Sequence, residues 1–382
     1  MPELPEVETI ARDLRGLVTG SLILDARSDW PATLRSHAAE SFRDAIVGRE
    51  IEGVGRRGKQ LLIWVGARDG AGAPRPGSGD GAAHSPAAAD PAVATVHLKM
   101  TGQLFVVAAE TPQDKHVHLV LVLADGRELR FRDIRKFGRV GLYRRDPSTG
   151  LPLEGEAEGV LAAGIEPLSD EFTAALFVRM LSRRRGRLKT LLLNQDFLAG
   201  VGNIYADESL WRARLHPLQD AHTVKPEGAR RLHQALRDVL AEAVERRGSS
   251  VDDYTAPEGD GSMQEHLAVY QRAGEPCLRC GRPISRIVVG GRATHFCPHC
   301  QRLPAGQRAA AGEAMVTMGR AAPPPNGPAT RRGPRWTELD GEGALGRTSD
   351  EEVKAAQRAA RVAATRKAAA SRRAAARSGG PA

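Results

Sequence analysis

Four cysteines are the residues of this chain whose spacing most directly indicates chemistry. All four lie within 24 residues, as two Cys-x-x-Cys pairs in the order Cys277, Cys280, Cys297 and Cys300. Paired thiolates at this spacing suit tetrahedral Zn²⁺, whereas a disulfide framework would usually spread its cysteines along the chain. We therefore expect one structural zinc ion. His295 and His299 lie near enough to be ligands, but four thiolates already fill the site.

Between the two cysteine pairs, Gly290-Gly291-Arg292 is expected at the tip of a small hairpin. Arg292 is either a finger that reaches a phosphate or an active site, or simply an exposed arginine in a turn. The residues alone favour neither reading.

A basic cluster suits a polyanionic partner. Six cations lie within eleven residues, directly before the turn Gly200-Val-Gly-Asn203: Arg179, Arg183, Arg184, Arg185, Arg187 and Lys189. Amides that glycine leaves free at a helix N-terminus bind phosphate, and nearby arginines add salt-sensitive affinity for a nucleic-acid backbone. A charge run is usually only a solvated face, but the glycine turn favours contact with DNA.

The amino terminus is a third candidate. Removal of Met1 would leave Pro2 as a free secondary amine, and α-amines titrate near pH 8, so part of it would be neutral and nucleophilic. Glu3 is a neighbouring candidate acid or base, and Lys59 could lower the pKa of the amine if the fold brings it close. Because most chain ends are frayed and inert, these residues alone do not indicate an enzyme.

Changes in hydrophobic periodicity and composition along the chain predict the elements that must position these groups. Residues 1–150 carry strand patterns at 60–65, 96–107 and 117–123, a hairpin turn at Asp125-Gly126, and one opening helix along the stripe from Val7 to Leu17. Residues 66–94 are rich in Gly, Ala, Pro and Ser and predict a flexible insert between strands.

Helical periodicity follows in residues 165–250. We expect helices over 171–181 and 188–193, a third that Asn203 caps and that runs through Trp211, and a fourth with an apolar stripe from Leu232 to Val244. Residues 264–302 hold the cysteines.

The net charge of +9 belongs mostly to the end of the chain. Residues 303–382 carry 14 Lys or Arg against 7 Asp or Glu, while residues 1–302 carry 41 against 39. This tail lacks a hydrophobic pattern, so we expect it to be disordered when free. No apolar run approaches the length of a membrane span, and the acidic amino terminus is not a secretory signal. A cytoplasmic protein is therefore expected.

Six motifs in order resemble the formamidopyrimidine-DNA glycosylase family. They are Pro2-Glu-Leu-Pro-Glu-Val-Glu8, Gly58-Lys59, His97-Leu-Lys-Met-Thr-Gly102, Arg132-Asp-Ile-Arg-Lys-Phe-Gly138, Gly200-Val-Gly-Asn-Ile-Tyr-Ala-Asp-Glu208 and the four cysteines. The resemblance covers residues 1–302. It implies a multidomain α+β fold: an N-terminal β-sandwich with flanking helices over 1–150, a helix–two-turn–helix domain over 151–263, a zinc finger over 264–302, and a tail over 303–382 outside the family pattern.

The same resemblance implies a bifunctional DNA glycosylase and abasic-site lyase. Pro2 would attack C1′ of a damaged nucleotide, and Glu3 would act as acid and base at the sugar. Lys59 would serve as general acid and base in strand cleavage, and Arg292 would contact phosphate.

Flipping the nucleotide out of the stack requires a filler for the vacancy. Met100, Arg135 and Phe137 match the family's void-filling residues, and a mobile loop within 249–263 would cover the base. The positions that would grip the DNA backbone are His116, Arg184, Lys189 and Asn203. The implied partner is double-stranded DNA with oxidised bases or abasic sites, bound by a monomer associated with the bacterial nucleoid, and the tail would add nonspecific affinity.

Leu4 and the void-filling residues favour oxidised purines over the oxidised pyrimidines of the sister endonuclease VIII family. Two other readings stay open: a catalytically silent lesion sensor with the same fold, and a zinc-ribbon scaffold for RNA or protein.

Overall fold

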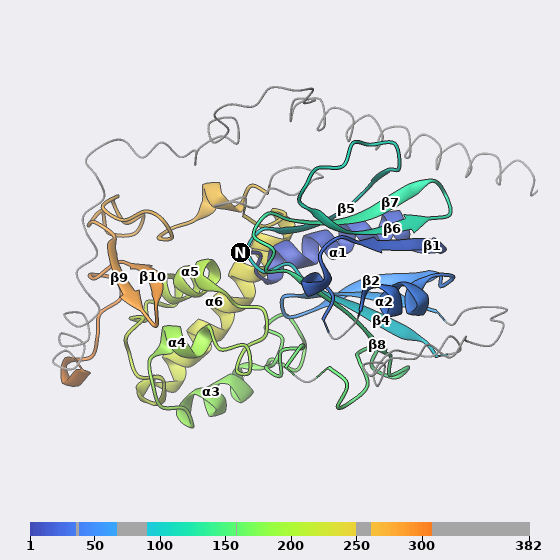
Figure 1. Ribbon diagram of the computed structural model, residues 1–382. Helices are drawn as coiled ribbons and strands as arrows, with labels where there is room; N and C mark the ends of the chain where they lie inside the picture. Colours follow the sequence, from blue (N-terminus) through green and yellow to red (C-terminus); the bar gives the residue numbers. More distant parts are fainter. Residues whose placement is uncertain (36–37, 67–89, 158, 250–260, 308–382) are drawn as a thin grey trace, which may run out of the picture.

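The structure is a computed structural model that describes residues 1–35, 38–66, 90–157, 159–249 and 261–307. Its N-terminal half contains two antiparallel four-stranded sheets (Figure 1). One has the order β1-β6-β7-β5, with strands β1 (Ile23–Ser28), β6 (Val117–Leu123), β7 (Arg127–Asp133) and β5 (Gly102–Ala108). The other has the order β2-β3-β4-β8, with strands β2 (Ile51–Arg57), β3 (Gln60–Val65), β4 (Ala92–His97) and β8 (Arg139–Arg144).

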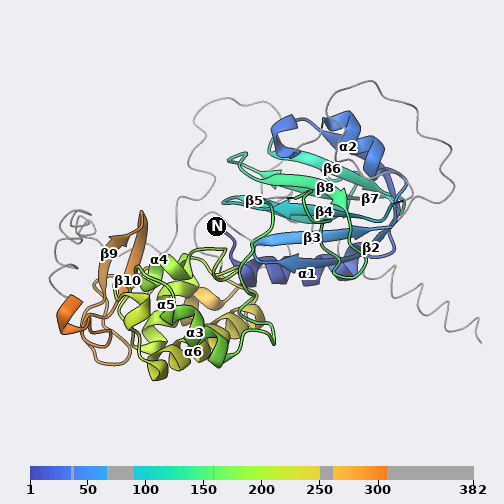
Figure 2. The same ribbon diagram turned by 90° about the horizontal axis from the view of Figure 1, so that it is seen from below.

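The two sheets share one apolar core. Leu121 and Phe131 from the first sheet and Ile63 and Val140 from the second are buried in the same cluster. Burial of alternate side chains from both inner faces is what makes two sheets stack as a sandwich. Helix α1 (Leu4–Val18) packs against β2, and α2 (Ala39–Ile46) packs against β1 (Figure 2).

The second half is helical. It consists of α3 (Ala174–Ser182), α4 (Leu188–Leu192), α5 (Asn203–Ala213) and α6 (Pro226–Glu245), around a core of its own. The predicted stripe of α6 is confirmed, because Leu232, Leu236, Val239 and Leu240 are fully buried. Single 3-10 turns lie at η1 (Pro31–Thr33), η2 (Ala221–Thr223), η3 (Met263–His266) and η4 (Ala305–Gln307).

A two-stranded hairpin follows, formed by β9 (Ser285–Val289) and β10 (Arg292–Phe296). At its tip Gly290 and Gly291 have φ of 55° and 73°, a pair of left-handed conformations that a two-residue turn requires and that glycine adopts without strain. The tip therefore presents Arg292 as the first residue of β10, which packs against α5.

Several element boundaries differ from the predictions. The strand expected over 96–107 is two strands, because β4 ends at His97 and β5 begins at Gly102; the insert expected over 66–94 ends earlier, since β4 begins at Ala92. Helix α3 begins at Ala174 rather than 171, where Thr173 accepts a hydrogen bond from the Leu176 amide and caps it. The hairpin turn at Asp125-Gly126 is confirmed.

Residues 67–89, 250–260 and 308–382 lie outside the described part of the chain. The body of the expected insert, most of the expected damage loop and most of the tail therefore fall there. Over the residues that are described, none of the helices combines the length and apolar character that crossing a membrane requires.

Candidate active site and nucleic-acid interface

The amino terminus lies between the two halves of the molecule, beside the start of α5 (Figure 2). Pro2 is buried, and Glu3 is only 3% exposed. The Glu3 carboxylate accepts hydrogen bonds from the backbone amides of Ile204 (3.0 Å) and Tyr205 (3.4 Å). The N-terminal residues therefore do not fray, because Glu3 binds the positive end of a helix from the other domain.

The turn before α5 needs glycine at two positions, because a side chain at either would collide with Glu3 or Leu4. A Cβ on Gly202 would lie 2.2 Å from Cδ of Glu3, and a Cβ on Gly200 would lie 2.7 Å from Cβ of Leu4. The Leu4 amide also donates to the Gly200 carbonyl at 3.0 Å. Glu3 therefore occupies the amides of Ile204 and Tyr205, which are not free for a DNA phosphate, and contact between the rest of the turn and the DNA backbone stays a prediction.

Glu6 is a buried residue of the site that the sequence analysis missed. Its carboxylate accepts hydrogen bonds from the Glu3 amide (2.8 Å), the Ser249 amide (2.8 Å) and the Tyr205 hydroxyl. Glu6 is the third helical residue of α1 and completes a capping box with Glu3. The Glu-x-x-Glu spacing was the available signal.

Lys59 lies in the tight turn between β2 and β3, directly after Gly58, whose φ is 58°. Its side chain is 9% exposed. Burial lowers the pKa of Lys59, while the charges of Glu3 and Glu6 raise it and that of Arg292 lowers it. Burial raises the pKa of Glu3, and Lys59 opposes this. The site thus brings together an amine and a carboxyl whose pKa values both move toward neutrality, as acid–base chemistry needs.

Lys189 contradicts the expectation that it grips DNA directly. Its side chain is fully buried, with Nζ 2.6 Å from Oδ1 of Asp207 and donating to the Ala293 carbonyl at 2.9 Å. A buried ammonium needs such a partner, which the sequence pattern could not reveal. Lys189 therefore supports the hairpin next to Arg292 instead of presenting its charge outward.

Asn203 contributes to the same support. Gly202, rather than Asn203, is the N-cap of α5, and the Asn203 amide nitrogen donates to the Ala293 carbonyl at 3.0 Å. Its Oδ1 is buried and has no hydrogen-bond partner among the described residues. Arg292 itself is exposed.

The three predicted void-filling residues lie on two neighbouring loops. Met100 is 38% and Phe137 48% exposed, and the guanidinium of Arg135 lies 5.2 Å from the centre of the Phe137 ring. The Thr101 side chain joins the loops, because its Oγ1 donates to the Asp133 carboxylate and accepts from the Arg135 amide at 3.1 Å. Exposed apolar side chains on anchored loops suit insertion into a base stack.

The remaining predicted backbone contacts are placed as follows. Arg184 is exposed just beyond α3, and His116 is half-buried before β6, where burial lowers its pKa. His97, which was not singled out, accepts a hydrogen bond from the Lys99 amide at 3.0 Å and so anchors the loop that carries Met100. Burial lowers the pKa of His97 to about 3, so it is neutral and able to accept.

The cysteine cluster fits one structural zinc ion. The Sγ atoms of Cys277, Cys280, Cys297 and Cys300 all lie within 4.8 Å of one another. The Trp211 indole donates to Cys277 Sγ at 3.4 Å, as expected of a thiolate acceptor. In the described part of the chain neither histidine joins this group: His295 lies 3.5 Å from Asp207, and His299 contacts Arg282.

Known families match all three parts of the chain. Residues 1–140 match the formamidopyrimidine-DNA glycosylase N-terminal domain, 163–255 its H2TH domain, and 274–303 the zinc finger found in FPG and IleRS. The formamidopyrimidine-DNA glycosylase of Herpetosiphon aurantiacus is 43% identical over 303 residues, which are 79% of this chain and 100% of that protein.

Solved structures agree with these matches. MutM (FPG) from Thermus thermophilus is 42% identical, with a TM-score of 0.63 over 79% of this chain and 100% of that one. The Lactococcus lactis FPG (MutM) in complex with a FAPY-dG containing DNA is 33% identical, with a TM-score of 0.65 over 78% of this chain and 100% of that one.

Proposed function

The chain belongs to the formamidopyrimidine-DNA glycosylase family, and from that premise we propose that it excises oxidised purines from duplex DNA and then cleaves the strand at the abasic site. The observation that carries the proposal is the buried group at the domain seam, where Glu3 and Lys59 lie beside Pro2. The likeness to a structure that holds a FAPY-dG containing DNA supports the choice of purines.

The chemistry begins at Pro2. After removal of Met1, its secondary amine attacks C1′, the C1′–N bond breaks, and the base departs with the bonding electrons. Glu3 donates a proton at the sugar, which helps the ring open and leaves an iminium ion between Pro2 and C1′. Because a secondary amine gives a cationic imine that cannot lose a proton from nitrogen, it is a persistent electron sink.

Strand cleavage follows from that electron sink. A base removes the C2′ proton, and an enamine with a C1′=C2′ bond forms as the iminium π electrons move onto nitrogen. The nitrogen lone pair then restores the iminium, the C1′=C2′ electrons form the C2′=C3′ bond, and the C3′–O bond breaks to release the 3′ phosphate with its bonding electrons. Lys59 is the residue proposed to move this proton, because burial favours its neutral amine. Arg292 would hold the phosphate during the second elimination, at C5′. The product is a one-nucleotide gap with phosphate on both sides.

Access to C1′ requires the nucleotide to leave the helix. We propose that Met100 and Phe137 fill the vacated stack and that Arg135 hydrogen-bonds the orphaned base. Their exposure supports this role. Arg184, His116 and Asn203 are proposed to contact the backbone, Asn203 through its unpartnered carbonyl oxygen and an intervening water. The working form is proposed to be a monomer that acts on the nucleoid in the cytoplasm.

One experiment tests the proposal. Excision and borohydride trapping are measured on duplexes with 8-oxoguanine, formamidopyrimidine, thymine glycol or an abasic site, with Pro2→Gly as the control. We expect purine lesions to be excised fastest, trapping of the wild type on 8-oxoguanine DNA, and loss of excision by roughly 10³-fold or more in Pro2→Gly.

Two results would reject it. Faster excision of thymine glycol would favour the pyrimidine specificity of the endonuclease VIII family. Lesion binding without excision or trapping would indicate a silent sensor.

A further inference from the structure

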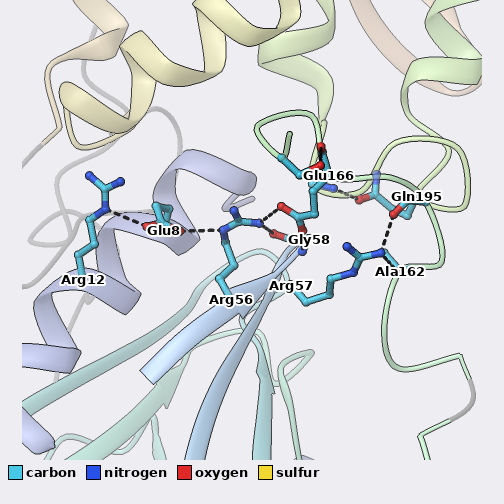
Figure 3. A network of polar contacts seen from close by, with 11 residues as sticks. Glu8, Arg12, Arg56, Arg57, Gly58, Ala162, Glu166 and Gln195 are labelled. Carbon is cyan, nitrogen blue, oxygen red and sulfur yellow. Dashed lines mark hydrogen bonds and ion pairs between the residues drawn. The ribbon is translucent and has the colours of Figure 1, made fainter. Parts of the chain in front are cut away.

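A chain of polar contacts runs from the sandwich to the helical domain past Arg56 and Gly58, the residues just before Lys59 in sequence (Figure 3). Glu166, in the segment between β8 and α3, is at its centre and 13% exposed. One of its carboxylate oxygens accepts from the Gly58 amide, and the other accepts from Nη1 of Arg56 at 2.6 Å. Glu166 therefore binds both the second-to-last residue of β2 and the residue directly before Lys59.

Two other elements also contact the β2–β3 turn. Gly58 has a left-handed φ of 58°, and the nearest atom to an added Cβ would be that of Ala162, at 3.3 Å. Arg56 Nε donates to Glu8 at 3.1 Å, and Arg57 donates to the Gly164 carbonyl at 2.8 Å. Groups of α1 and of the interdomain segment thus hold the turn, and Glu166 is the carboxylate that binds both Arg56 and the Gly58 amide, whereas Glu8 contacts Arg56 alone of these two.

The same interdomain segment also reaches the turn that holds Glu3. The Gly164 amide donates to the Gln195 carbonyl at 3.0 Å, and the Gln195 side chain accepts from the Gly200 amide at 2.9 Å. Its amide nitrogen donates to the Val201 carbonyl at 2.8 Å. A continuous set of hydrogen bonds therefore links the β2–β3 turn, which carries Lys59, to the Gly200–Gly202 turn, which contacts Glu3, across the two domains.

We propose that Glu166 is a positioning residue that fixes the buried Lys59 amine relative to Glu3 by holding the Arg56–Gly58 turn. This inference rests on the proposed function for the role of Lys59, but the placement of Lys59 can be measured without any reaction. Glu166 acts through the turn and touches no reacting atom. Placement matters because acid–base transfer falls steeply when the group moves by about 1 Å.

The test uses the full chain with Glu166→Ala, Glu166→Gln and a matched control, Asp13→Asn. Asp13 also forms an interdomain ion pair, with Arg247 at the end of α6, but neither residue is in the set of contacts around Lys59. Glu166→Gln keeps an acceptor for the Gly58 amide and loses the charge and the second oxygen that bind Arg56. If Glu166→Ala does not fold, Glu166→Gln carries the test.

The first readout is acetylation of Lys59 in the native protein by an N-hydroxysuccinimide ester, followed by peptide mass spectrometry. We expect about tenfold faster labelling in Glu166→Ala, a smaller increase in Glu166→Gln and none in Asp13→Asn. Unchanged labelling of Lys59 in a folded Glu166 variant would overturn the proposal, whatever the activity of the wild type.

The second readout separates steps of the reaction under single-turnover conditions on an abasic duplex. In Glu166→Ala we expect β-elimination to slow by about tenfold or more while borohydride trapping, which depends on Pro2, stays within about twofold of the wild type. The pH midpoint of β-elimination should rise, because a displaced Lys59 regains water and with it a higher pKa. Equal loss of trapping and elimination, with no change in the midpoint, would indicate general destabilisation and reject the positioning role. Absence of trapping in the wild type would instead reject the proposed function.

Discussion

Two parts of the candidate site differ in burial: the domain seam around Glu3 and Glu6, and the loops that carry Met100 and Phe137. At the seam, Glu3 and Glu6 are buried and their carboxylates accept hydrogen bonds from several donors. On the loops, Met100 and Phe137 are exposed, and only the backbone around them is anchored. Reacting groups must be fixed and dry before substrate arrives, whereas a wedge must stay uncovered until DNA covers it.

The largest effect is expected when one methyl group is added beside Glu3, in the rigid part of the site. Gly202→Ala places a Cβ 2.2 Å from Cδ of Glu3, so the Glu3 carboxylate must move away from the α5 N-terminus. We expect base excision to fall by about 100-fold in single-turnover assays. The control is Gly16→Ala, an exposed position in α1 with no atom within 4 Å of the added Cβ. It should keep full activity and gain up to about 1 kcal/mol in unfolding free energy. Equal activity of the two variants would contradict the role of the turn.

A smaller effect is expected on the loops. The double variant Met100→Ala, Phe137→Ala removes the wedge, and we expect excision to slow by about tenfold because lost stacking is worth roughly 1–3 kcal/mol per base. Its thermal midpoint should match that of the wild type, since exposed side chains contribute little to the core. A clear fall in the thermal midpoint of the double variant would remove the distinction between the two parts.

The smallest effect is a difference in pH dependence. Because burial lowers the pKa of Lys59, its neutral form accumulates as the pH rises and reaches half below the usual lysine range. The rate of β-elimination on abasic DNA should therefore rise with pH and level off below that range. Lys59→Arg, which stays cationic, should lose this rise, and the wedge variant should retain it with the same midpoint. Trapping is followed in parallel so that titration of Pro2 is accounted for. An identical profile in Lys59→Arg would exclude Lys59 as the titrating base.

Local patterns predicted the elements well where a residue's environment follows from its neighbours in sequence. The apolar run from Val117 to Leu123, the stripe of α6 and the cysteine spacing each specify a strand, a helix or a cluster through short-range periodicity. The start of α3 and the break between β4 and β5 were placed less well. There, Thr173 and Gly102 set the boundaries by contacts that periodicity does not contain.

The site itself was less accessible to sequence reasoning. A glycine turn before a helix indicates an anion, but the residues do not reveal whether that anion is a phosphate or Glu3. Likewise Lys189 belongs to a run of cations, and only the fold brings Asp207 against it and removes it from the surface. Glu166 contacts Gly58 across 108 residues of sequence, a distance that no local pattern spans.

The buried position of Pro2 has a consequence for the order of events during synthesis. Glu6, four residues after Pro2, is bound by the Ser249 amide, so the pocket around the amino terminus cannot close until about 250 residues have left the ribosome. At roughly 5–20 residues per second, that delay is on the order of 10–50 s. The aminopeptidase that must expose the Pro2 amine thus has its opportunity while the chain is still growing. Because Glu6 and Ser249 are far apart in sequence, the Pro2 amine stays accessible to the aminopeptidase until the fold encloses it.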